Sequence, residues 1–142
     1  MSMFESAAIG NPAYTETLAS EPASAQFARS LVASALQVWE LEEAEDAALL
    51  VMSELVSNAI THAGRGSIRV IVTRQAEHVV RLAVVDFSRE LPRRREAAGD
   101  AEDGRGLSIV AALTDNKWGA EPLPWGKRVW ADLMVAKERT DA

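Results

Sequence analysis

One segment in the middle of the chain carries the residues best suited to chemistry. Glu54, Asn58 and His62 follow one another at four-residue intervals within an apolar, helix-forming run. Positions four apart lie on one side of an α-helix, so the three polar groups share a stripe while Val51 and Leu55 turn toward a core. An amide oxygen suits a hard cation such as magnesium, and a carboxylate one turn away can accept a proton. Taken alone, the segment is interpreted as an amphipathic surface helix with a polar edge.

Two further motifs change that interpretation. An apolar, strand-like run begins at Val79 and ends in a carboxylate at Asp86. Later, Gly104-Arg105-Gly106-Leu107 is expected to form a glycine-rich turn that opens a helix at Leu107. Such glycines let backbone N–H groups approach a phosphate, and the N-terminal dipole of the following helix favours an anion. A lone Gly-x-Gly is usually just a turn, so the order of all three motifs carries the argument.

This order of motifs resembles the ATP-binding module shared by gyrase, the heat-shock chaperone ATPases, histidine kinases and the MutL proteins, the GHKL superfamily. Within it the chain is most similar to the stand-alone anti-sigma-factor serine/threonine kinases and their regulatory relatives. The resemblance runs from about Tyr14 to Ala136 and includes Ser53-Glu54-Leu55-Val56-Ser57-Asn58-Ala59 and Lys117-Trp118-Gly119. It implies an α+β, Bergerat-type fold, a two-layer α/β sandwich with a mixed, mostly antiparallel sheet and helices on one face.

The resemblance also implies a role for each motif residue. Asn58 would bind the Mg2+ that bridges the ATP phosphates, and Glu54 would be the general base that takes a proton from an attacking hydroxyl. His62 would lie near the phosphates, and Asp86 would accept a hydrogen bond from the adenine amino group. The phosphate cradle would consist of Gly104, Arg105, Gly106 and Leu107. The alternatives are a surface amide for Asn58, a helix-supporting acid for Glu54 and a strand-end charge for Asp86; the motif order favours the ligand role of Asn58. Arg105 could reach the phosphates, but a solvent-facing arginine is the favoured interpretation at that position.

The chain departs from the family pattern in two places. The usual Asp-x-Gly-x-Gly after the strand is replaced by Asp86-Phe87-Ser88-Arg89-Glu90, so both glycines are missing. Thr61 stands where relatives often have a basic residue, which predicts modest phosphate affinity. The charged stretch from Pro92 to Asp103 has no sustained apolar face and is expected to be a mobile loop that serves as the nucleotide lid.

Composition limits the classes of function. The chain has 142 residues, 48% of them hydrophobic and 25% charged, which is ordinary for one soluble domain. Its net charge of -6 and pI near 5.0 argue against direct nucleic-acid binding. The absence of cysteine excludes a disulfide framework and a thiolate metal site, and two isolated histidines cannot make a zinc site without several carboxylates. We expect a cytoplasmic protein, because there is no membrane-spanning apolar run and no secretion signal.

Hydrophobic periodicity predicts the elements that position the motifs. We expect a flexible lead-in over 1–12 and an ATP-binding domain over 13–138. The expected elements are a strand at Tyr14–Leu18, a helix capped by Ser24 and ending at Trp39, a helix at Glu42–Ala63, a hairpin of Ser67–Arg74 and Val79–Phe87, a helix at Leu107–Leu113, and a final hairpin that Trp118 and Val129–Val135 complete around Pro124-Trp125-Gly126.

Together these features predict an ATP-binding regulatory protein of the anti-sigma-factor type. It would phosphorylate a serine or threonine of a small anti-anti-sigma (STAS-type) protein. One alternative is a nucleotide-binding module that sequesters a sigma factor without kinase turnover, and another is a scaffold that has lost nucleotide binding. The resemblance also implies a homodimer as one assembly. Trp125, in a predicted turn, is the tryptophan expected to touch a partner.

Overall fold

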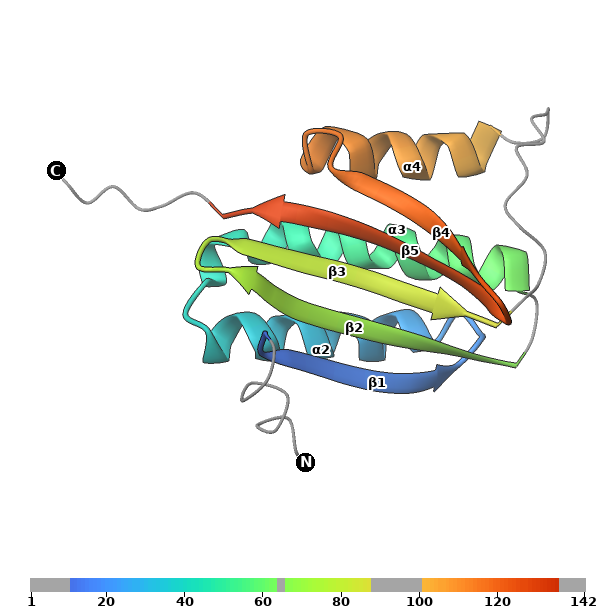
Figure 1. Ribbon diagram of the computed structural model, residues 1–142, viewed down its shortest axis with the longest axis horizontal. Coiled ribbons are helices and arrows are strands. Elements are labelled where there is room, and N and C mark those ends of the chain that lie inside the picture. The colour runs from blue at the N-terminus through green and yellow to red at the C-terminus, as the bar shows by residue number, and fades with distance from the viewer. Residues whose placement is uncertain (1–10, 64–65, 88–100, 136–142) are drawn as a thin grey trace, which may run out of the picture.

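The chain folds into an antiparallel sheet with helices packed against it (Figure 1). The computed structural model describes residues 11–63, 66–87 and 101–135. The expected α+β, two-layer fold is therefore confirmed. In chain order the elements are β1 (Ala13–Ala19), α2 (Ser24–Val38), the short 3-10 helix η1 (Glu42–Ala44), α3 (Glu45–Ala63), β2 (Ser67–Ala76), β3 (Val79–Asp86), α4 (Ala101–Leu113), β4 (Trp118–Leu123) and β5 (Gly126–Met134).

The strand order of the sheet is β1-β2-β3-β5-β4, and each of its pairings is antiparallel. Strands β2 and β3 form one predicted hairpin and β4 and β5 form the other. Because β5 lies between β3 and β4, the segment from β3 to β4, which contains α4, passes from the centre of the sheet to its edge. This order puts the end of β3 directly beside the start of β5.

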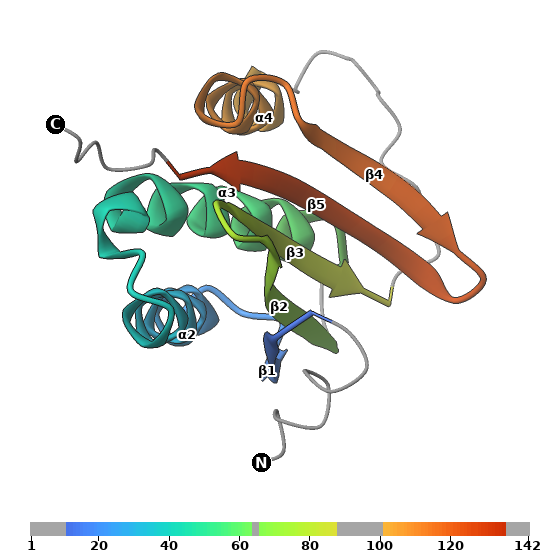
Figure 2. The ribbon, with the colours of Figure 1, turned by 60° about the vertical axis from the view of Figure 1, so that its left-hand side comes forward.

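The core lies between the sheet and the helices, and Figure 2 shows α2 and α3 on one side of the strands. Each strand alternates, so every second side chain points to the helix layer. On α3 the apolar spacing gives one fully buried stripe. Its members are at most 2% exposed: Ala48, Val51, Met52, Leu55, Val56 and Ala59. Among the described residues, no helix has the length and apolar character needed to cross a bilayer.

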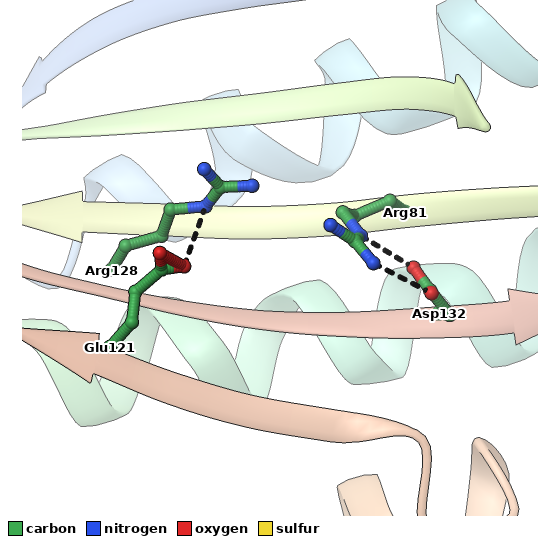
Figure 3. Close-up of polar contacts among 4 residues, drawn as sticks. All are labelled: Arg81, Glu121, Arg128 and Asp132. Atoms are coloured by element: carbon green, nitrogen blue, oxygen red, sulfur yellow. Dashed lines mark hydrogen bonds and ion pairs between the residues drawn. The ribbon is translucent and has the colours of Figure 1, made fainter.

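On the sheet face that α2 and α3 leave uncovered, cross-strand ion pairs join neighbouring strands (Figure 3). Arg81 Nε donates to Asp132 Oδ1 at 2.7 Å, and its Nη2 donates to Oδ2 at 2.9 Å. This double hydrogen bond raises the pKa of Arg81, although partial burial acts in the opposite direction. The same guanidinium lies 4.3 Å from the ring centre of Trp130. Trp118, by contrast, packs against the core.

Ser24 does not cap α2, so that prediction is wrong. The helix begins at Ser24 itself, and the preceding Ala23 makes no side-chain capping bond. The Ser24 hydroxyl instead donates to the carbonyl oxygen of Ala19 at 2.6 Å. Since Ser24 is 3% exposed, its hydroxyl needs a buried acceptor, and the end of β1 supplies one. The other strand and helix boundaries agree with the predictions to within about two residues, except at the starts of three elements. Helix α4 is described below, α3 begins at Glu45 after η1 and not at Glu42, and β5 begins at Gly126 and not at Val129.

We expect Gly126→Ala to destabilise the fold much more than Gly119→Ala. A Cβ on Gly126 would overlap the backbone carbonyl oxygen of Asp86 and lie 2.9 Å from the Phe87 Cα, and backbone cannot move aside cheaply. A Cβ on Gly119 would meet only the Trp130 indole at 3.0 Å, and that side chain can shift. Urea denaturation should show a loss of about 2 kcal/mol or more for Gly126→Ala. Equal losses would mean that β3 and β5 do not approach this closely.

Candidate functional site

The elements that carry the predicted site residues converge at one end of the molecule. In Figure 1 the C-terminal half of α3, the end of β3 and the N-terminal half of α4 all lie at the right-hand end. Helix α3 contacts both α4 and β3. The fold thus brings together three motifs that are far apart in the sequence.

Glu54 lies against α4 at Gly106. A Cβ added to Gly106 would come within 2.7 Å of Glu54 Oε1, so the absence of a side chain at this position makes room for the carboxylate. Glu54 is half-buried, and among the described residues its carboxylate has no hydrogen-bond or ion-pair partner. A carboxylate that no protein donor occupies can accept a proton or a hydrogen bond from a ligand.

Helix α4 begins earlier than predicted, and this changes the role expected of its glycines. The helix starts at Ala101, so Gly104 and Gly106 lie within it and Leu107 does not open it. A glycine inside a helix costs about 1 kcal/mol relative to alanine, and at Gly106 the contact with Glu54 gives a reason for it. The expected turn at 104–107 is therefore wrong. Leu107 is partly buried, whereas the side chain of Arg105 lies outside the description.

The lid prediction is tested only at its end. Residues 92–100 of the proposed lid lie outside the described residues. Residues 101–103 form the first turn of α4, so the expectation of a loop is wrong there. The predicted division into 1–12 and 13–138 remains a prediction.

Asn58 and His62 continue the polar stripe of α3 beyond Glu54. Both side chains are half-buried and lie at the edge of the buried apolar stripe. Asn58 has no hydrogen-bond partner among the described residues, so its amide oxygen can serve a ligand. His62 lies in the last turn of α3 and has an interaction partner of its own. The helical spacing of these residues therefore gives the shared edge that was predicted.

Asp86 forms a buried ion pair with Lys127. The Lys127 Nζ donates to Asp86 Oδ2 at 2.6 Å, and each side chain is 1% exposed. The two residues are direct partners in the antiparallel pairing of β3 with β5. Their neighbours two residues away, Val84 and Val129, belong to the core, so the pair faces the helix layer. The carboxylate that was expected to hydrogen-bond adenine thus forms an ion pair with a lysine in this structure.

An exposed aromatic pair flanks this ion pair. Phe87 follows Asp86, and Trp125 lies two residues before Lys127 in the β4–β5 turn. Their rings stack with centres 5.3 Å apart and planes inclined by 27°. Phe87 is 43% exposed and Trp125 50% exposed. Both aromatic side chains are therefore accessible beside the end of β3.

The sequence analysis did not identify Lys127, although the sequence contains a signal for it. Along β5 the inward positions are Lys127, Val129, Ala131 and Leu133, so a lysine opens an otherwise apolar series. Fully buried lysines are rare unless they are paired. The inward positions of β3 also end in a charge, at Asp86. The helix-facing positions of β3 and of β5 each end in a charge, and the two charges are opposite. They indicate an ion pair once β3 and β5 are known to be neighbours.

Comparison with known proteins identifies the family of this chain. The family model described as the histidine kinase-like ATPase domain matches residues 18–120, more than half of the chain. The chain belongs to this family. Membership indicates an ATP-binding domain with kinase-like or ATPase-like chemistry, so the superfamily resemblance is confirmed at this level. A search of curated proteins finds no match.

The described residues of this histidine kinase-like ATPase domain can supply one Mg2+ ligand, with water and phosphate oxygens supplying the others. They contain no group of three or more His, Cys, Asp or Glu that could hold a metal ion. Mg2+ usually keeps several waters and binds proteins through one or two oxygen ligands together with substrate phosphates. Asn58 provides such an oxygen, and a metal held there would neutralise phosphate charge. The donor set therefore suits a metal that arrives with a nucleotide.

We expect Lys127→Met to destabilise the domain by about 3 to 5 kcal/mol, because it removes the ammonium group that forms an ion pair with the buried Asp86 carboxylate. Arg81→Met is the matched control. It breaks an ion pair whose side chains are 24% and 17% exposed, so water can replace part of the loss. Chemical denaturation followed by tryptophan fluorescence measures both variants. A loss for Lys127→Met no larger than for Arg81→Met would show that the Asp86–Lys127 pair is solvated in solution.

Proposed function

We propose that this chain binds ATP with Mg2+ at the end of the sandwich where α3, α4 and β3 meet. The observation that carries the proposal is the shared edge of Glu54 and Asn58 on α3, with Gly106 of α4 directly against Glu54, in a member of the histidine kinase-like ATPase domain family. Asn58 holds the metal at the phosphates. Asp86, at the end of β3, accepts a hydrogen bond from the adenine amino group.

We further propose that the protein is a serine/threonine kinase of the anti-sigma-factor type. Glu54 takes the proton from the hydroxyl of a serine or threonine as that oxygen attacks the terminal phosphate of ATP, and ADP leaves. Support comes from the Glu54 carboxylate, which no described donor occupies. The substrate is a small anti-anti-sigma (STAS-type) protein. Trp125, half exposed and stacked on Phe87, is our candidate for contact with that partner.

A second candidate function is nucleotide-dependent sequestration of a sigma factor without phosphoryl transfer. The missing glycines after Asp86 favour it, because the chain departs there from the usual Asp-x-Gly-x-Gly pattern of the family. A phosphotransfer assay with a co-purifying partner separates this candidate from the kinase.

We expect ATP with Mg2+ to raise the melting temperature of the protein, and Asn58→Ala to abolish most of that rise. A ligand at about a hundredfold above its Kd stabilises the folded state by about 2.7 kcal/mol. Ser57→Ala, at an exposed position next to Asn58, is the control and should respond like wild type. Thermal shift and calorimetry make the measurement. Failure of millimolar ATP with Mg2+ to bind the wild type would leave the scaffold interpretation, in which nucleotide binding has been lost.

For the kinase we expect Glu54→Gln to keep ATP affinity and to lower the phosphotransfer rate. A positioned general base typically contributes about a hundredfold to ten-thousandfold in rate, while the amide keeps the shape of the side chain. Asp46→Asn, two turns earlier on α3 and exposed, is the matched control and should transfer phosphate normally. Single-turnover phosphorylation of the partner gives the rates. If Glu54→Gln transfers as fast as wild type, another group is the base.

A further inference from the structure

The ammonium group of Lys127 has more hydrogen-bond donors than the described protein uses. A lysine ammonium carries three N–H donors. Among the described residues, its hydrogen bond goes to Asp86 Oδ2 at 2.6 Å, and no other is present. Lys127 is 1% exposed. Because burial of charged donors without acceptors is costly, the remaining N–H groups favour a site for an acceptor supplied by a ligand.

The pair also has a definite place relative to the proposed nucleotide site. Asp86 and Lys127 are cross-strand partners, so their side chains emerge side by side on the helix-facing side of the sheet. A carboxylate next to an ammonium presents a hydrogen-bond acceptor next to a donor. The Watson–Crick edge of adenine presents the complement, an amino group at C6 that donates and the ring nitrogen N1 that accepts.

We propose that Lys127 is a specificity-determining residue that reads the base of the bound nucleotide. It keeps its bond to Asp86 and donates a second hydrogen bond to N1 of adenine, while Asp86 accepts from the amino group. Guanine carries a hydrogen at N1, which would point at the ammonium, so the pair selects ATP over GTP. This inference rests on the proposed ATP-binding function and adds a residue to it.

The decisive experiment varies the nucleotide rather than the protein. Calorimetry on wild type compares ATP with 1-deaza-ATP, in which a C–H replaces N1 and the amino group remains. We expect 1-deaza-ATP to bind about tenfold to a hundredfold more weakly, the usual effect of losing a hydrogen bond to a charged group. GTP should bind at least as weakly. This arm needs no substitution, so it does not depend on whether a Lys127 variant folds.

A second arm assigns the effect to Lys127. Lys127→Met should weaken ATP by a similar factor and leave 1-deaza-ATP at its already reduced affinity, because both changes remove the same hydrogen bond. Arg128→Met is the matched control, since Arg128 is the next residue and lies on the opposite face of the sheet beside Glu121. It should keep the wild-type ratio of ATP to 1-deaza-ATP affinity.

The outcomes separate this inference from the proposed function. If wild type binds ATP and 1-deaza-ATP equally well, or if Lys127→Met binds ATP as tightly as or more tightly than wild type, Lys127 does not read the base, although ATP binding stands. GTP affinity equal to that of ATP overturns the adenine selectivity. If none of the nucleotides binds wild type, the proposed function fails and this inference fails with it.

Discussion

The burial of helix α3 is the constraint on which the rest of the structure depends. One continuous stripe of the helix, from Ala48 to Ala59, has almost no contact with solvent. Removing a single large side chain from such a core typically costs about 2 to 5 kcal/mol, so the helix cannot rotate about its axis without a large loss. With that rotation fixed, Glu54, Asn58 and His62 must emerge along one edge of the helix. The position of the candidate site is thus a consequence of core packing.

The pairing of β3 with β5 applies a second constraint at the same end of the molecule. Asp86 and Lys127 lie directly opposite each other on the helix-facing side only in the observed register. A slip of one residue would move one of the two charges to the other face and break the buried ion pair, at a cost of several kcal/mol. The absence of a side chain at Gly126 lets β5 begin directly against the backbone of Asp86 and Phe87. Charge pairing and close backbone approach therefore define the end of the sheet next to α3.

Predictions from local sequence patterns were correct where hydrophobic periodicity alone determines the element. They were wrong where a tertiary contact competes with the local motif. The alternating strands and the long apolar stripe of α3 were predicted with nearly their observed bounds, because periodicity responds directly to burial. Ser24 fits the pattern of a helix cap, yet its hydroxyl bonds back to Ala19. Gly104 and Gly106 fit the pattern of a turn, yet they lie in α4. At Ser24 and at Gly106, a contact with another element explains the residue better than the local motif does.

By itself the sequence determined the fold class, the order of the elements and the polar edge formed by Glu54 and Asn58, since these depend on residue spacing along single elements. It also contained the family resemblance, which the match over residues 18–120 supports. Only the tertiary structure decided that Asp86 forms an ion pair with Lys127 and that Glu54 packs against Gly106. These contacts join positions 41 and 52 residues apart. Strand order and helix packing bring such residues together, and no spacing along one element encodes them.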